Sequence, residues 1–431
     1  MTEQNKFNTP GYRRSRWAYT FECAFEYFIA LMVADAFLAT LLTEMGLKDG
    51  VIGVISSLIS LAFLFQLFSI LVVQHIRNVK CVAIPIHCIS QLFFLVLYLL
   101  PFFNIPAQFR TAMVVGCILV AYFGNYLVTA VIFNWGNSYV NPNTRANFAA
   151  TKEIISLISG VVVSLTMGWT FDSYVAKGNI NGGFLFIAAM MLLMNIGDFV
   201  CLMMMKNRKT EKKDADSVEP FWQVIRMLFA NRGFVCSVAL HAMWSISVYM
   251  TIGFMGTYKT KELLLSVGAV QIINIVACLM RALFSKPIAR YADKRSYAKG
   301  IRLGMIIAAC GYLVNMFTTP SLWWLVILYT ILYNVACAGT SQNMMNMVYS
   351  YVDRKYFVQA SAIKYSVSGL CGFSASMLAS RILNAVQSGG NSFLGISIYG
   401  QQLLSAISFV LVIVCILFVK FVVEKQKIIA K

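Results

Sequence analysis

The sequence predicts an all-α membrane protein with twelve transmembrane helices arranged in two pseudo-symmetric six-helix halves. Three observations lead to this fold class: a composition that is 59% hydrophobic and only 12% charged, apolar runs long enough to cross a bilayer, and a short motif that occurs twice. An ordinary soluble domain contains about 25% charged residues. The chain is therefore expected to lie largely in lipid.

Runs of about twenty apolar residues, the length that crosses a bilayer as a helix, recur along the whole chain. Transmembrane β-strands would give segments of about ten residues with alternating polarity, a pattern that the sequence does not show. A helical bundle is therefore predicted. The expected spans are residues 18–42, 50–73, 81–101, 111–133, 150–170, 183–204, 233–256, 263–284, 300–319, 321–343, 358–383 and 397–423.

A motif that begins with Ser-Tyr-Val occurs once in each half of the chain, and each copy closes a loop after the fourth or tenth predicted span. A lysine at the start of the next span belongs to each copy. The match relates the first six spans to the last six, as in a parallel repeat about an axis along the membrane normal. Chance similarity between helix starts is the alternative. The identical pairs are Ser138/Ser350, Tyr139/Tyr351, Val140/Val352, Ala150/Ala362, Lys152/Lys364, Ser156/Ser368 and Gly160/Gly372.

Between the halves lies the longest charged segment, KNRKTEKKDADSVEP, which is typical of a cytoplasmic linker. The apolar residues that follow it group around two arginines and predict a short helix in the membrane interface. The expected organisation is an N-terminal six-helix half at 1–205, a linker with an interfacial helix at 206–232, and a C-terminal half at 233–431.

The net charge of +18 is spread over the loops, whereas a nucleic-acid-binding surface gathers its basic residues on one soluble face. If the N-terminus is cytoplasmic, most lysines and arginines fall on the cytoplasmic side, which predicts both termini inside and an even number of spans. We therefore expect no nucleic-acid partner, a monomer in the cytoplasmic (inner) membrane, and contact with anionic lipid headgroups on the cytoplasmic side. The exceptions that fall outside are Lys48, Arg110, Lys177, Lys259, Lys261 and Arg381.

The first apolar run carries three acidic residues and no small-residue cleavage site, so it is expected to be a retained helix and not a signal peptide. The eleven cysteines lie within predicted spans, at spacings typical of neither a metal site nor a disulfide framework. No metal site and no cofactor are expected.

The loop after the eighth span, SKPIARYADKRSYAKGIRLG, resembles the signature loop of the major facilitator superfamily, in which an acidic residue is followed by basic ones. The corresponding loop of the first half has Arg77 where the acidic residue is expected. The resemblance implies the fold of two six-helix halves, and it implies that this loop latches a cytoplasmic gate. Asp293, Lys294 and Lys299 match the signature, while Ala289, Ser296 and Ala298 depart from it. The expected gate residues are Lys152, Asp293, Lys294 and Lys364.

Ionisable residues within spans are costly and usually face a cavity or a partner. Glu22 and Glu26 are one helical turn apart and share a face, and two carboxylates so close in lipid resist ionising together. These residues and Asp35 are the expected coupling groups, for H⁺ or Na⁺ as the coupling ion. Hydration near the interface, or pairing with a lysine, is the alternative for the glutamates. We interpret Asp198 as a structural acid, and either His87 or His241 could relay a proton.

Amide side chains are frequent within the spans, and they can bind hydroxyl-rich solutes or hold helices together. Their number within the spans favours a neutral, sugar-like polar solute. The expected substrate-binding residues are Gln66, Gln91, Asn125, His241, Gln271, Asn274 and Asn334.

The sequence contains no Gly-x-x-x-x-Gly-Lys-Ser/Thr loop for ATP and no extended soluble catalytic segment. We therefore expect a secondary active transporter, not an enzyme, that moves a small organic solute by alternating access with H⁺ or Na⁺ coupling. Efflux of amphiphilic drugs is one alternative. A transport-inactive receptor or scaffold of the same fold is another.

Overall fold

The computed structural model describes residues 9–68, 78–141, 145–207, 221–353, 356–393 and 396–426. These residues are almost entirely helical, apart from a small antiparallel hairpin of two-residue strands. Eleven of the described helices are long and apolar enough to cross a membrane, or twelve if the bent pair α2 and α3 counts as one span. The predicted all-α membrane fold is thus confirmed.

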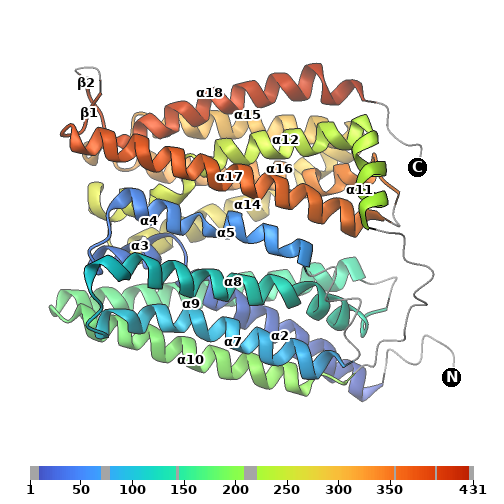
Figure 1. The fold of residues 1–431 in the computed structure, drawn as a ribbon, viewed down its shortest axis with the longest axis horizontal. Helices are drawn as coiled ribbons and strands as arrows, with labels where there is room; N and C mark the ends of the chain where they lie inside the picture. Colours follow the sequence, from blue (N-terminus) through green and yellow to red (C-terminus); the bar gives the residue numbers. More distant parts are fainter. Residues whose placement is uncertain are drawn as a thin grey trace. The chain divides into compact units, whose positions relative to one another are not determined.

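The chain divides into two compact units (Figure 1). Unit 1 takes the described parts of Met1–Met45 and Phe68–Ser217, and unit 2 takes those of Gly46–Leu67 and Val218–Lys431. The expected boundaries at 205 and 232 remain a prediction. Unit 1 contains α2 (Pro10–Met32), α3 (Asp35–Glu44), α7 (Val79–Leu99), η2 (Leu100–Phe102), α8 (Ala107–Asn137), α9 (Arg145–Ala176) and α10 (Ile180–Met204).

Unit 2 holds the second predicted span together with the helices of the second half. The short helix expected after the linker is present as α11. The elements are α4 (Asp49–Ser56), α5 (Leu58–Ala62), η1 (Phe63–Phe65), α11 (Phe221–Ala230), α12 (Arg232–Tyr249), η5 (Ile252–Phe254), α13 (Met255–Thr257), η6 (Tyr258–Glu262), α14 (Val267–Arg295), α15 (Tyr297–Asn315), η7 (Pro320–Leu322), α16 (Leu325–Tyr349), α17 (Phe357–Ser388), β1 (Ser392–Phe393), β2 (Ile396–Ser397), α18 (Gly400–Phe421) and η9 (Val423–Lys425).

The first predicted span is broken and not continuous. Helices α2 and α3 meet at an angle of 45°, and Asp35 at the break has φ of 44°. This left-handed backbone interrupts the helix, and aspartate tolerates it better than most side chains because its short carboxylate can bond locally. The apolar pattern alone did not predict this break.

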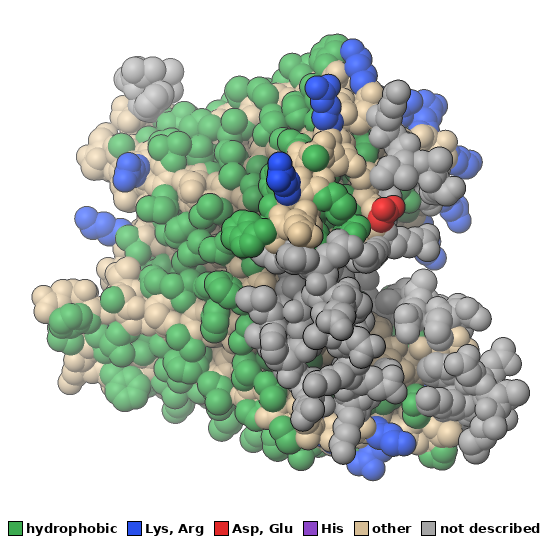
Figure 2. All heavy atoms as spheres, turned by 45° about the vertical axis from the view of Figure 1, so that its right-hand side comes forward, with side chains coloured by type: hydrophobic (Ala, Val, Ile, Leu, Met, Phe, Trp, Pro, Cys, Tyr) green, Lys and Arg blue, Asp and Glu red, His purple; other side chains and the backbone are tan. Residues whose placement is uncertain are grey.

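Large apolar side chains cover the outer surfaces of the helices, as expected for contact with lipid. Leu283, Ile158 and Val162 are each more than 60% exposed. Figure 2 shows a broad hydrophobic surface, with most of the visible lysine and arginine side chains toward its edges. Buried polar groups inside a unit are therefore separated from the surroundings by apolar side chains.

Small residues let α4 and α5 pack closely along α17 within unit 2 (Figure 1). The Ser60 hydroxyl donates to the Gly369 carbonyl at 2.6 Å, and the Ser366 hydroxyl donates to the Phe63 carbonyl at 3.2 Å. A Cβ added at Gly369 would stand 2.2 Å from the Ser60 carbonyl oxygen. The second predicted span is thus held to α17 by backbone contacts that larger side chains would prevent.

An ion pair lies at the start of α4, next to the contact between α4 and α17. The Asp49 carboxylate accepts hydrogen bonds from the Lys261 ammonium and from the Gln387 amide, the latter at 3.0 Å. The side chain of Asp49 is 9% exposed and that of Lys261 is 31% exposed, so the pair is partly shielded from solvent. It ties α4 to η6 and to the far end of α17.

We expect Gly369→Ala to destabilise the protein by about 1 to 3 kcal/mol, because the added methyl group would force apart two backbones in contact. Gly116→Ala in α8 is the matched control, since a Cβ there meets nothing within 4 Å and alanine favours a helix by about 1 kcal/mol over glycine. Thermal unfolding of the detergent-purified variants measures both. An equal melting temperature for the two variants would contradict the close packing of α5 on α17.

Candidate functional site

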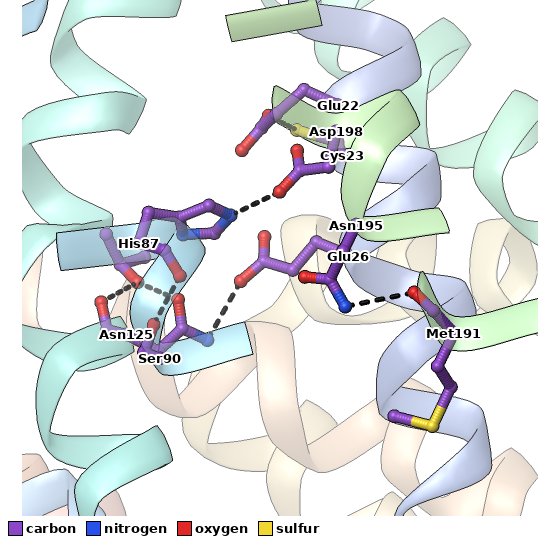
Figure 3. A network of polar contacts seen from close by, with 10 residues as sticks. Glu22, Cys23, Glu26, His87, Ser90, Asn125, Met191, Asn195 and Asp198 are labelled. Carbon is purple, nitrogen blue, oxygen red and sulfur yellow. Dashed lines mark hydrogen bonds and ion pairs between the residues drawn. The ribbon is translucent and has the colours of Figure 1, made fainter. Parts of the chain in front are cut away.

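A group of ionisable side chains lies inside unit 1, where α2, α7 and α10 meet (Figure 3). Glu22, His87 and Asp198 are each 1% exposed or less. The Nε2 atom of His87 lies 2.8 Å from Oδ2 of Asp198. One ligand atom from each of the three residues lies within 4.8 Å of the others. We call these three residues the buried triad.

The depth of these residues in their helices explains why they meet. His87 lies eight residues after the start of α7 at Val79, and Asp198 lies six residues before the end of α10 at Met204. At 1.5 Å per residue both are about 9 to 12 Å from the same end of unit 1. Glu22 lies near the middle of α2, which begins at Pro10. Helix α2 packs against both α7 and α10. Three separate spans thus bring an ionisable group to one level.

Glu26 extends the buried triad by one helical turn along α2. Its carboxylate accepts a hydrogen bond from the Asn125 amide of α8 at 3.0 Å. The Thr129 hydroxyl, one turn further along α8, donates to the Asn125 carbonyl at 2.7 Å. Glu26 is half-buried, in contrast to Glu22. The two glutamates therefore share a face of α2, as predicted, but differ in burial.

Lys152 approaches the buried triad from α9 through a thiol. Its ammonium donates to the sulfur of Cys23 at 3.1 Å and to the hydroxyl of Tyr19 at 3.3 Å. The Cys23 thiol in turn donates to a carboxylate oxygen of Glu22 at 3.1 Å. The repeated lysine of the first half is thus one hydrogen-bonded group away from Glu22.

Several buried polar atoms around the buried triad have no hydrogen-bond partner among the described residues. They are Nδ1 of His87, Oδ1 of Asp198, Oδ1 of Asn195 and Oε1 of Gln91. Buried polar groups are nearly always bonded, so unpaired ones indicate a strained or functional site. The arrangement has unused capacity to bind a proton or to accept a hydrogen bond.

The charges in this region do not balance if every acid is ionised. Glu22, Glu26 and Asp198 bring three carboxyl groups together, and among the described residues the nearby groups that can carry positive charge are His87 and Lys152. Several carboxylates in a medium poorer than water cannot all hold their charge without more cations. The three acids therefore cannot all be ionised here unless a further cation balances their charge.

The spacing of the ligand atoms in the buried triad would also suit a metal ion. Nε2 of His87 is, however, already engaged by Asp198 in a short hydrogen bond. That bond engages Nε2 of His87 and Oδ2 of Asp198 without a metal, while Nδ1 and Oδ1 have no partner among the described residues. We therefore interpret the buried triad as a proton-sharing group.

Two other residues predicted for unit 1 are not members of the buried triad. Asp35 is half-buried at the break between α2 and α3, and Gln91 is buried in α7 one turn beyond His87. Asp198, interpreted from the sequence as a structural acid, is a central member of the buried triad. The sequence does hold a signal for this role of Asp198, because Asp198 is an ionisable residue within a span at a depth similar to that of Glu22.

The residues predicted for unit 2 are distributed over several helices. His241 lies in α12, with its ring nearly perpendicular to that of Tyr365 at 5.1 Å. Asn334 bonds within its own helix, donating to the Thr330 carbonyl at 2.9 Å. Gln271 is buried in α14 and Asn274 is half-buried there. Gln66, directly after η1, is half-buried.

The predicted gate residues lie at helix ends or just inside them. Lys294 is exposed near the end of α14. Asp293 belongs to the same helix, but its side chain lies outside the described part of the structure. Lys364 is buried in α17 and donates to the Met344 carbonyl at 2.6 Å.

Comparison with known proteins assigns the chain to a family. The family model of the Major Facilitator Superfamily matches residues 20–376. The chain belongs to the major facilitator superfamily. Its predicted resemblance to that family is thereby confirmed, and with it membership in a class of membrane transporters. No curated protein matches the sequence.

Solved structures of this superfamily share the fold at low sequence identity. The nucleoside transporter NupG matches with a TM-score of 0.70 at 13% identity, covering 97% of this chain and 100% of its own. A bacterial homolog of the human lysosomal transporter Spinster gives a TM-score of 0.70 at 13% identity, with 96% and 97% covered. An autoinhibited peptide transporter of the POT family gives 0.69 at 10%, with 98% of both chains covered.

We expect Asp198→Ala to destabilise the protein by about 3 to 5 kcal/mol, because removing one partner leaves the other buried polar group uncompensated. A double-mutant cycle with His87→Ala provides the control. The double variant should lose less stability than the sum of the two single variants, since neither partner is then left alone. Reversible unfolding in mixed micelles measures the four proteins. Strict additivity would show that the two side chains do not interact.

Proposed function

We propose that this superfamily member is a proton-coupled secondary transporter of a small polar organic solute, and that its coupling site is the buried triad with Glu26. The single observation that carries the proposal is the excess of buried carboxyl groups around one histidine in unit 1. Such a cluster can hold or release a proton, and its net charge changes when it does. The family fold and the internal repeat support alternating access.

The chemistry of the ligands favours H⁺ over Na⁺. Hard cations bind best to shells of oxygen atoms, whereas this site has an imidazole at its centre and a thiol at its edge. Histidine is the side chain that exchanges protons near neutral pH. A proton can also pass along the short bond between His87 and Asp198, which a sodium ion cannot use.

Coupling follows from the cost of burying charge. When the cluster lacks its proton, its net negative charge disfavours any conformation that closes it off from water. When it is protonated, or when Lys152 moves closer, that penalty falls and the switch between conformations becomes accessible. Solute and proton therefore cross together if the empty, charged state cannot complete the switch.

The amide side chains within the helices support a solute that forms hydrogen bonds. Amides such as Gln91, Asn125 and Gln271 lie inside their units. The structural neighbours include a nucleoside transporter and a peptide transporter, and sugar-like solutes have comparable hydrogen-bonding groups. Efflux of amphiphiles and a transport-inactive receptor remain the competing functions, and the experiment below separates them.

Proteoliposomes that enclose a pH-sensitive dye test the proposal. We expect one class among sugars, nucleosides, short peptides and lipophilic cations to evoke proton uptake in the wild type. Glu22→Gln and His87→Gln should abolish solute-driven proton uptake while retaining exchange of labelled solute across the membrane. Glu44→Gln, at an exposed residue of α3, is the matched control and should transport normally.

Three outcomes would contradict the proposal. Transport that requires Na⁺ and is indifferent to a pH gradient would assign the coupling to another ion. Proton uptake driven by lipophilic cations alone would favour amphiphile efflux. If no solute evokes proton uptake and no labelled solute is exchanged across the membrane, a receptor function is favoured.

A further inference from the structure

Lys364 is a buried cation that lacks a counter-charge among the described residues. It lies in α17, is 1% exposed, and ranks among the largest fully buried side chains of the protein. Its ammonium donates to the Met344 carbonyl of α16 at 2.6 Å. An ammonium has three N–H donors, so a single carbonyl leaves capacity for two further acceptors.

The two halves treat their repeated lysine differently. Lys152 is connected to Glu22 through the Cys23 thiol, so a carboxyl group lies close to its charge. Lys364 has no such neighbour, because α12, the first long helix of the second half, contains no acidic residue. The acids of the sequence between 233 and 426 are Glu262, Asp293, Asp353 and Glu424, which belong to helix ends or to a loop.

Among the described residues, the surroundings of Lys364 add aromatic and basic groups and no acid. The following residue, Tyr365, stacks edge-on with His241 of α12, and its hydroxyl contacts the sulfur of Met345 at 3.3 Å. His241 carries a buried Nδ1 atom without a partner among the described residues. Arg281 in α14 is a further half-buried cation of this unit. Asp49, a buried acid of unit 2, pairs with Lys261 and bonds Gln387 at the other end of α17 from Lys364. The region around Lys364 is therefore electropositive among the described residues, whereas the buried triad of unit 1 brings carboxyl groups together.

A buried cation without a counter-charge is costly and is seldom kept unless it has a function. We propose that Lys364 binds an oxyanion of the transported solute, either a carboxylate or a phosphate. This inference rests on the proposed transport function and names the substrate class. Lys364 is covered in the present conformation, so the anion would reach it in a conformation that opens this part of unit 2.

A purely structural role makes the opposite prediction for stability. If Lys364 serves only to hold the Met344 carbonyl, then Lys364→Met removes a useful bond and lowers the melting temperature of the unliganded protein. If the lysine is kept for a ligand, methionine replaces a buried charge with an apolar side chain of similar length. The melting temperature of Lys364→Met without solute should then equal or exceed that of the wild type.

Binding is tested with matched pairs of solutes that differ in one charge. The pairs are uridine and uridine 5′-monophosphate, a dipeptide and its C-terminal amide, and glucose and gluconate, each at fixed ionic strength and pH. Thermal stabilisation of the detergent-purified protein reports binding without any gradient. We expect at least one anionic member to stabilise the wild type and its neutral partner not to do so. Which pair responds distinguishes phosphate from carboxylate.

Substitutions at Lys364 decide the assignment. Lys364→Gln and Lys364→Met should weaken binding of the anionic solute by about 30-fold or more, as removing one member of a buried charge pair does. Lys364→Arg should retain part of the affinity. Lys177→Gln, which removes an exposed lysine of unit 1, should bind as the wild type does.

The proposal is overturned if neutral members stabilise as well as anionic ones, if no anionic member stabilises the wild type, or if Lys364→Gln retains full affinity. A lowered melting temperature for unliganded Lys364→Met would also contradict it. Because these measurements need no proton gradient, they can fail while proton coupling at Glu22 and His87 succeeds, and the reverse.

Discussion

The hydrogen bond between His87 and Asp198 beside Glu22 is the constraint on which the rest of unit 1 depends. It joins α7 to α10 in an apolar region, and Glu22 on α2 adds a second acid, so the group cannot hold all its negative charges at once without a further cation. Burial makes ionisation of these groups costly, and under the proposed function each proton gained or lost changes the cost of closing the site. The same three residues in water would titrate independently and control nothing.

Charge is divided between the halves of a repeated fold. The first half surrounds its repeated lysine with a phenol, a thiol and a carboxyl group, whereas the second half leaves Lys364 with a backbone carbonyl. A symmetric scaffold has thus been given asymmetric interiors. In our account the acidic interior handles the proton and the basic interior handles the solute, so that neither half performs transport alone.

The sequence predicted the helical membrane fold, the repeat and the shared face of Glu22 and Glu26, because hydrophobic length and helical periodicity are local properties. It did not predict which acids from other spans meet them, since that depends on how helices rotate and how deep they sit. Asp198 shows the limit: its distance from the end of its span matched that of His87, but only packing revealed the pair. Asn334 donates to a carbonyl of its own helix, and its role in binding the substrate stays a prediction.

The most direct test of the central claim is infrared difference spectroscopy of the purified protein during a pH titration. The carboxylic C=O stretch reports protonation of buried acids without any need for a known solute. The account predicts a titrating band in the wild type that Glu22→Gln and Asp198→Asn each remove or shift, and that Glu44→Gln leaves unchanged. A spectrum without a titrating buried carboxyl group, or a band indifferent to Glu22 and Asp198, would contradict the account.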